Sequence, residues 1–281
     1  MTMSIQHTHF VFREARTASE LESLFQLRYQ GYLKSSCASL VHQNEYGLEF
    51  DSYDWHAFHL GLFQEGQYGA QPVGYMRLVQ DKPSPMASLV SKLAGQFPEL
   101  PPPPAADAPL PMIGSCPQKD WLLGWYRSRT QLGQRVVEGS RFVFSPEIRA
   151  SGYARFVFEG ALASTFYRYG YDYALLACHP RHSSFYLQYG FQQLLDGNSN
   201  NYKGLIASVL GMTKGEIARK RAAGIEAMAR QGKSDGSIYM LPDNSTVAVP
   251  MPKVSVSDSR LALNKGGSRN GLGQSETFGH Q

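Results

Sequence analysis

The stretch SRFVFSPEIRASGYARFVFEG (residues 140–160) joins a predicted strand to a predicted helix. It opens with alternating apolar residues that predict a strand, and it closes in a segment of helical period that begins after Gly152. A glycine-containing turn between a strand and a helix leaves the first backbone N–H groups of the helix pointing outward, so it attracts an anion. Gly152 permits close backbone approach, and Arg149 adds a positive charge. The stretch therefore predicts a phosphate-binding turn, with an ordinary tight turn as the alternative.

The segments on either side of this turn alternate between strand and helix. We predict a strand at 135–146, a helix at 152–169, a buried strand at 171–178 and a short helix at 182–191. This order forms a βαβ unit, so at least part of the sheet is parallel. Nearer the N-terminus, we expect a helix over about 18–34, strands over 55–63 and 72–79, a hairpin turn between those strands, and a helix-compatible segment at 86–97.

The composition fits a globular protein whose positive charge lies towards one end. Hydrophobic residues make up 42% of the 281 residues, which is enough for a buried core. The net charge of +4 comes from Gly211 to Gln281, which hold ten Lys or Arg and six Asp or Glu, whereas the first 210 residues balance at seventeen against seventeen. No run of about eighteen apolar residues occurs, so we expect a cytoplasmic protein without stable membrane insertion. The three widely spaced cysteines suit a reducing compartment without disulfides.

The chain divides into one domain and two smaller pieces. We expect a domain over about 10–205, interrupted by a proline-rich surface excursion at about 98–112 (PELPPPPAADAPLPM) whose prolines cannot join a central sheet. A basic C-terminal helix is predicted within 206–231, started by a capping box at Thr213 and Glu216. The tail at 232–281 is rich in Ser, Gly, Asn and Lys and is expected to be disordered.

Two motifs resemble those of GCN5-related N-acyltransferases (GNATs). RASGYA (149–154) is similar to their pyrophosphate-binding pattern, and FYLQYGF (185–191) resembles a later helix motif of the same fold. The resemblance implies an α/β GNAT-like fold with a mixed central sheet flanked by helices. It also implies that Tyr186 protonates the departing thiolate. The residues that it implies for phosphopantetheine binding are Phe142, Arg149, Gly152, Tyr153 and Ala154.

Four further motifs resemble the acidic and basic signature of acyl-homoserine-lactone autoinducer synthases. They are LRY (27–29), EFDSYD (49–54), GYMRL (74–78) and EGSRF (138–142), similar to that signature in order and local spacing. Related N-acyl amino acid synthases share the fold and take acyl groups from acyl carrier protein. The resemblance covers about residues 10–195, and it implies an acyl-phosphopantetheine donor, on acyl carrier protein or coenzyme A, with no tightly bound cofactor.

The residue types in these motifs suit acyl transfer to an amine. Glu138, on the strand before the turn, is placed to accept the amine proton as a general base. Asp51 and Asp54 can bind an ammonium group, and arginines can hold these acids or bind an acceptor carboxylate. The acceptor-binding or charge-network residues are Arg28, Glu49, Asp51, Asp54, Arg77 and Arg141. The alternative for this set is a structural network of salt bridges.

These observations predict an N-acyltransferase that moves a fatty acyl group from acyl carrier protein to a small amine, an amino acid by preference. The alternatives are an acetyl-coenzyme-A-dependent acetyltransferase and a non-catalytic module that binds an acyl ligand or a partner. Arg155 and Arg181 are expected to lie near the donor entrance, where positive charge would attract an acidic carrier protein.

Three other patterns carry weaker functional predictions. His56 and His59 lie three residues apart on a predicted strand and so face opposite sides, and we expect no metal site. Cys178 at a strand end is expected to be a core residue rather than a nucleophile. The basic C-terminal helix lacks interleaved aromatic residues, so nucleic-acid binding is not expected.

Overall fold

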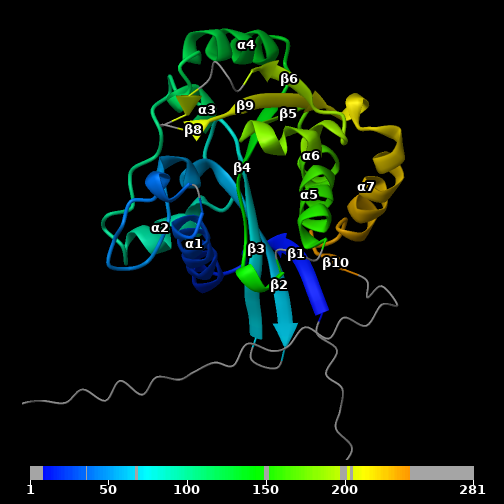
Figure 1. The fold of residues 1–281 in the computed structure, drawn as a ribbon. Coiled ribbons are helices and arrows are strands. Elements are labelled where there is room, and N and C mark those ends of the chain that lie inside the picture. Colours follow the sequence, from blue (N-terminus) through cyan, green and yellow to red (C-terminus); the bar gives the residue numbers. More distant parts are fainter. Residues whose placement is uncertain are drawn as a thin grey trace, which may run out of the picture. The chain divides into compact units, whose positions relative to one another are not determined.

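The structure, a computed structural model, describes residues 9–35, 37–66, 69–148, 152–196, 201–202 and 205–240. Its centre is a mixed eight-stranded sheet in the order β10-β1-β2-β3-β4-β5-β9-β6 (Figure 1). The strands are β1 (His9–Glu14), β2 (Ala57–Gly66), β3 (Gly69–Val79), β4 (Val136–Phe144), β5 (Tyr173–Cys178), β6 (Gln192–Leu195), β9 (Ser208–Thr213) and β10 (Ile238–Met240). β7 (Asn201–Tyr202) and β8 (Leu205–Ile206) pair with each other in a separate two-stranded sheet.

Helices cover both faces of this sheet (Figure 1). They are α1 (Ala18–Leu33), α2 (Ala87–Ala94), α3 (Pro111–Ser115), α4 (Lys119–Gln131), α5 (Tyr153–Ala163), α6 (Ser183–Leu187) and α7 (Arg219–Gln231). A π-helical turn, Ser164–Arg168, continues α5. Among the described residues, no helix is long and apolar enough to cross a membrane.

The predicted strand–helix–strand unit around residue 152 is present. β4 and β5 pair in parallel and α5 connects them, while the other pairs of the sheet are antiparallel. The predicted α/β class with a mixed sheet flanked by helices is therefore confirmed. The first helix also starts as predicted, because the Thr17 side chain accepts a hydrogen bond from the Glu20 N–H at 3.1 Å.

The predicted domain boundary near residue 205 differs from the structure. β9 lies between β5 and β6 inside the sheet, and β10 pairs with β1 at its edge. The helix predicted within 206–231 begins only at Arg219, because 208–213 is a strand and the Thr213–Glu216 capping box starts a 3-10 turn instead. Part of the predicted disordered tail is ordered, since Ile238 is 2% exposed in β10. Residues 241–281 lie outside the described residues.

The proline-rich excursion also differs from its prediction as a surface segment. Leu110 and Met112 are 0% and 1% exposed, and α3 begins inside the range predicted as an excursion. α4 is absent from the sequence prediction; its Leu122 and Tyr126 are buried at a spacing of one helical turn. Together α3 and α4 bury a second apolar cluster against the β4–β5–β9 side of the sheet.

Candidate active site

The acidic loop before β2 is shaped by a capping box. The Asp51 side chain accepts a hydrogen bond from the Tyr53 N–H at 2.9 Å, and the Asp54 side chain accepts one from the Asp51 N–H at 2.7 Å. This reciprocal pair starts the 3-10 turn Ser52–His56. Two carboxylates are thereby fixed close together, although like charges repel.

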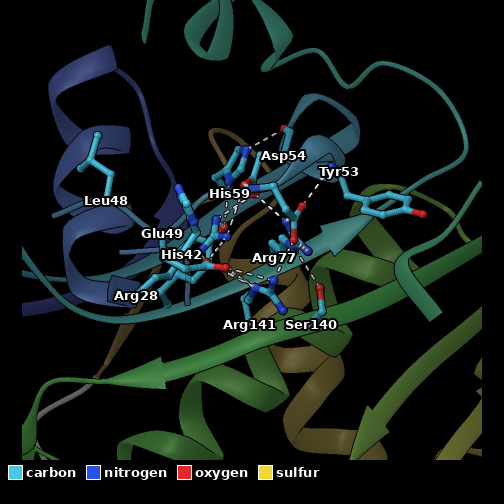
Figure 2. A network of polar contacts seen from close by, with 12 residues as sticks. Arg28, His42, Leu48, Glu49, Tyr53, Asp54, His59, Arg77, Ser140 and Arg141 are labelled. Atoms are coloured by element: carbon cyan, nitrogen blue, oxygen red, sulfur yellow. Dashed lines mark hydrogen bonds and ion pairs between the residues drawn. The ribbon is translucent and has the colours of Figure 1, made fainter. Parts of the chain in front are cut away.

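Three arginines converge on the acids of this region, as Figure 2 shows. Arg77 on β3 donates from Nη1 to Asp51 and to Asp54, both at 2.7 Å. Arg28 on α1 donates to Asp54 at 2.7 Å and also binds Glu49. The structure therefore brings together all six predicted network residues, which we call the charge cluster: Arg28, Glu49, Asp51, Asp54, Arg77 and Arg141.

Arg141 closes the charge cluster from the β4 side. It donates to Asp51 at 2.8 Å and to Glu49 at 3.1 Å. Its φ of 58° is left-handed, which is uncommon outside glycine. The cause is a β-bulge. Tyr75 lies opposite Val143 and Arg77 lies opposite Ser140, so β4 has one more residue than β3 over this stretch. The bulge turns the Arg141 side chain towards the acids.

The charges of the cluster balance, with three arginines against three carboxylates. Burial by itself raises the pKa of Asp51, but Arg77 and Arg141 outweigh burial and hold that pKa well below its usual range. The pKa of Asp54 is likewise lowered, because Arg28 and Arg77 outweigh its burial. Both acids therefore stay ionised at neutral pH, and neither can act as a base there.

Tyr75 and His59 extend the charge cluster into the core. His59 Nε2 lies 3.0 Å from the Asp54 carbonyl oxygen, which can only accept, so Nε2 carries the proton. Nδ1 then accepts from the Tyr75 hydroxyl at 2.8 Å, and that hydroxyl accepts from Arg28 at 3.3 Å. Burial lowers the pKa of His59 to about 4, so its ring is neutral. The ring is a structural support of the cluster.

Glu138 lies on β4 beside the charge cluster but outside it. Its side chain is 3% exposed, and it accepts a hydrogen bond from the Met112 N–H at 2.9 Å. Burial raises the pKa of Glu138 to about 7, although the Met112 hydrogen bond and the charges of Arg77 and Arg141 act in the opposite direction. A carboxyl with this pKa can exchange protons near neutral pH, which suits a general base.

β4 and β5 separate next to Glu138. They pair only from Val136 opposite Tyr173 to Gly139 opposite Leu176, whereas β4 stays paired with β3 as far as Phe144. In Figure 1, β4 continues away from the β5 end of the sheet. A parting of two parallel strands leaves room for an extended ligand between them, and Glu138 lies at its start.

The predicted phosphate turn precedes α5. Gly152 has a φ of 77° and forms the N-cap of the helix. A Cβ there would meet nothing within 4 Å, so the left-handed backbone rather than crowding favours glycine. Tyr153 is buried against Phe10, with ring centroids 4.8 Å apart, and Ala154 is partly buried. Arg149 lies outside the described residues.

Phe142 and Tyr186 meet at one ring of α5. The centroid of Phe158 lies 6.2 Å from that of Phe142 and 5.2 Å from that of Tyr186. Burial raises the pKa of Tyr186, so its hydroxyl keeps its proton at neutral pH. Cys178 lies near this tyrosine, and burial raises the pKa of its thiol. A neutral thiol is a poor nucleophile, in line with the predicted core role.

A small apolar cavity lies on the α5 side of β4 and β5. Gly139 borders it, and a Cβ at this position would come within 2.8 Å of the Met76 side chain. The cavity and Glu138 therefore lie on opposite faces of β4 at adjacent positions. Its lining comprises Met76, Leu78, Val137, Gly139, Phe158, Ala161, Leu162, Thr165, Ala174, Leu175, Leu176 and Phe191.

The two histidines of the acidic region do not form a shared ligand set. His59 uses both ring nitrogens within the core, as described above. Burial lowers the pKa of His56. Within the described ranges, no group of three His, Cys, Asp or Glu side chains is placed to hold a metal ion.

The arginines expected near the donor entrance occupy different environments. Arg155 donates to Glu159 at 2.9 Å, with 60% of its side chain exposed. α7 brings a second arginine to the same acid, because Arg221 lies 3.5 Å from it. Two exposed basic residues, Arg219 and Lys220, begin that helix. Arg181 is exposed in the turn before α6.

Four residues of this site were not predicted from the sequence. Tyr75 and Ser140 lie inside the GYMRL and EGSRF motifs, and Ser140 accepts a hydrogen bond from Arg77 Nε at 2.9 Å. His59 was considered only as a metal ligand, which was not expected, and Met112 lay in the segment predicted as a surface excursion. A signal for Tyr75 was present, because it lies two residues before Arg77 on a predicted strand and so shares the face of Arg77. Met112 acts through its backbone, which no sequence motif marks.

Comparison with known proteins bears on this arrangement. Residues 126–213 match the family model of the N-acyl amino acid synthase FeeM. The resemblance to N-acyl amino acid synthases is confirmed. The matched segment contains β4, α5, β5, α6 and β9, so it includes Glu138, Gly152 and Tyr186. The match supports the predicted enzyme class, N-acyltransferase, and the GNAT-like fold. Most of the charge cluster lies before the matched segment.

Three of the solved structures that are similar to this chain have the following names and similarities. The N-acyl amino acid synthase FeeM from uncultured soil microbes is 15% identical, with 76% of this chain and 94% of that chain covered and a TM-score of 0.47. The coenzyme-A-dependent acyl-homoserine lactone synthase BjaI is 15% identical, with 79% and 90% covered and a TM-score of 0.44. An acyl-CoA N-acyltransferase from Pseudomonas aeruginosa is 15% identical, with 74% and 100% covered and a TM-score of 0.42. No curated protein matches.

Proposed function

We propose that this protein transfers a fatty acyl group from acyl carrier protein to the amine of a small acceptor, with an amino acid as the acceptor class. The observation that carries the proposal is the place of Glu138 at the point where β4 and β5 part. A base at this point can reach an amine that meets a thioester lying between the strands. The match of this segment to an N-acyl amino acid synthase supports the N-acyltransferase class.

The proposed reaction uses two proton transfers. Glu138 removes a proton from the acceptor amine as the nitrogen attacks the thioester carbonyl and forms the new C–N bond. The C–S bond then breaks, and Tyr186 donates its proton to the leaving thiolate. The pKa of Glu138, raised to about 7, lets this carboxylate accept a proton near neutral pH. Tyr186 holds its proton at that pH, although its raised pKa makes it a weaker acid towards the thiolate. The products are an amide and the free phosphopantetheine thiol.

The donor is proposed to lie on the α5 side of the sheet. The first backbone N–H groups of α5, after Gly152, are proposed to bind the phosphate of phosphopantetheine, as in other anion sites at helix N-termini. The acyl chain is proposed to start among the apolar side chains beside Gly139, which would have to move apart to admit it because the cavity there is small. Phe142 and Tyr186 border the path between the two.

The acceptor is proposed to meet the charge cluster at its outer members. Asp51 and Arg141 keep 27% and 12% of their side chains exposed, whereas Arg28, Arg77 and Asp54 are fully buried. A carboxylate and a guanidinium next to each other match the ammonium and carboxylate groups of an amino acid. We assign the three buried members a structural role, which is the alternative that the sequence left open.

Positive charge at the donor entrance is proposed to attract the carrier protein. Exchange of Arg155 for glutamate (Arg155→Glu) should slow the use of an acyl carrier protein donor far more than that of a short pantetheine thioester. The difference should narrow as salt rises, because exposed charges are screened over about 10 Å at 0.1 M salt. An equal loss with both donors would contradict carrier-protein docking and favour coenzyme A.

The proposed function is tested with defined donors and acceptors. The purified protein is incubated with acyl carrier protein thioesters or coenzyme A thioesters, each with and without a mixture of amino acids, and the products are identified by mass spectrometry. An N-acyl amino acid formed from the carrier-protein donor supports the proposal. Product from coenzyme A donors alone overturns the donor assignment. If the protein binds the acyl donor but forms no product with any acceptor, the proposed catalytic activity is contradicted and an acyl-binding module is favoured.

A further inference from the structure

The backbone of α3 touches the carboxyl group of Glu138. The Met112 N–H donates to Oε2 of Glu138 at 2.9 Å. Within the described part of the chain, no hydrogen bond reaches the other oxygen, Oε1. The two oxygens of this carboxyl group are therefore distinguished by their surroundings: one is held by backbone, and one is available to a ligand.

Packing holds α3 in this place. The side chains of Leu110, Met112 and Ile113 are 0%, 1% and 3% exposed, and they belong to the same apolar cluster as Val136 on β4. The preceding proline run is tied down as well, since the indole N–H of Trp55 donates to the Pro101 carbonyl at 2.8 Å. Several buried groups thus fix the position of the Met112 N–H relative to β4.

We propose that α3 is a positioning element for acyl transfer, in which the Met112 N–H holds Oε2 of Glu138 so that Oε1 is presented to the acceptor amine. This role rests on the proposed function, in which Glu138 is the base. The last torsion of a glutamate side chain is broad, so an unheld carboxyl would sample many orientations. A base that is held in one orientation needs less reorganisation when the amine arrives.

The same hydrogen bond acts on the charge state of Glu138. Arg77 on β3 and Arg141 on β4 favour the ionised carboxylate, whereas Asp51 and burial oppose it. The Met112 N–H also favours the ionised form, because it donates to a negative oxygen. Loss of this hydrogen bond should therefore raise the pKa of Glu138. As the pH is lowered, kcat/KM should then begin to fall at a higher pH than in the wild type.

A pair of proline substitutions separates this effect from a loss of packing. Met112→Pro and Ile113→Pro each remove a buried side chain and place proline in the first turn of α3, but only Met112→Pro removes the N–H that Glu138 accepts. The readouts are the acid limb of the kcat/KM profile and the carboxyl titration of Glu138 by carbon-13 NMR. We expect Met112→Pro to move both midpoints up by about one pH unit relative to Ile113→Pro.

Equal midpoints in the two variants would overturn the positioning role. If Met112→Pro does not fold, as judged by circular dichroism, Met112 is replaced by its α-hydroxy acid, which exchanges only the N–H for oxygen, with the same replacement at Ile113 as control. The same shift is then expected, and its absence overturns the role. Failure of the proposed function is a separate result, because the wild-type protein would then form no acylated product with any donor.

Discussion

The two faces of β4 hold their residues in place by different means. On the α1 side, each arginine of the charge cluster binds at least two acids, so no member has a single partner. On the α5 side, aromatic rings surround Phe158, and its contacts are Phe142, Phe185, Tyr186, Tyr189 and Phe191. Ion pairs in the interior depend on direction and on charge balance, whereas ring packing depends mainly on volume. The two faces should therefore fail differently when one residue is removed.

The largest effect is expected from Arg77→Met. This change leaves Asp51 and Asp54 without their shared partner in the interior, so the free energy of unfolding should fall by about 3 to 5 kcal/mol in urea denaturation. Arg155→Met is the matched control, because the Arg155 side chain is 60% exposed and Arg221 stays beside Glu159, so the change should cost less than about 1 kcal/mol. A loss of stability from Arg77→Met no larger than that of the control would contradict the interdependence of the charge cluster.

A smaller and less specific loss is expected on the other face. Phe158→Ala should lower the free energy of unfolding by about 3 kcal/mol, because a fully packed ring is replaced by a cavity. Phe158→Leu should recover about half of that loss by refilling the volume. Recovery by leucine, measured in the same urea series, distinguishes volume from geometry. If leucine is as harmful as alanine, ring geometry matters on this face too.

Glu138 shares the face of β4 that carries the charge cluster, but its removal should act on rate rather than on stability. Glu138→Gln keeps the acceptor for the Met112 N–H but removes basicity, so kcat should fall about 100-fold with little change in KM. Glu159→Gln is the control, since it is also a buried glutamate but lies on α5. Turnover is measured with saturating donor and acceptor. Near-normal turnover of Glu138→Gln would remove Glu138 from the role of base.

The pH dependence of stability contrasts Glu138 with the charge cluster. Its pKa is raised from 4.5 to about 7 by burial, so the folded state binds more protons than the unfolded state between these values and stability falls as pH rises. From pH 5 to pH 8, the wild type should lose about 2 kcal/mol relative to Glu138→Gln. His59, with a pKa lowered to about 4, acts in the opposite sense but is common to both proteins. A difference that does not change with pH would contradict the raised pKa.

Asp51 and Asp54 supply the other half of this contrast. Their pKa values are lowered in the folded state, so their contribution to stability is present above the unfolded value and is lost only as pH falls below it. The charge cluster should therefore be insensitive to pH over the range in which Glu138 titrates. Unfolding curves between pH 5 and pH 8 test both statements together.

The smallest effect is expected at the phosphate turn. Gly152→Ala places a side chain at a φ of 77°, which should cost about 1 kcal/mol in local strain and raise the donor KM several-fold. Gly152→Asn should be milder, because asparagine tolerates this backbone region. Steady-state kinetics with varied donor give both values. If neither variant changes the donor KM, the turn does not bind phosphate.

The parts predictable from the sequence were those in which local pattern and tertiary structure agree. The strand and the helix within 140–160 and the capped first helix each carry their own signals, and all three are present. The charge cluster was predictable as a set, because its members lie in short motifs with the order of a known signature. Its geometry was not, since the β-bulge at Arg141 depends on pairing with β3.

The wrong predictions concern segments whose partners are distant in the chain. β9 and β10 are short, and each is a strand only because β5 or β1 provides an edge. α3 was not predicted because of the prolines around it. From sequence alone, a proline at the first position of a helix cannot be distinguished from a proline in a loop. The contact between Met112 and Glu138 uses a backbone N–H, and such a group has no residue type to recognise.

The pairing of β1 with β10 affects how the chain can be made. β1 comes from residues 9–14 and its outer neighbour from residues 238–240, so the sheet edge is completed near the end of the described chain. At synthesis rates of about 5–20 residues per second, β1 would wait roughly ten seconds or more on the ribosome for that neighbour. Its open edge, which carries the apolar residues Phe10, Val11 and Phe12, would be a site for mispairing between nascent chains. Early termination of translation before β10 would make that exposure permanent.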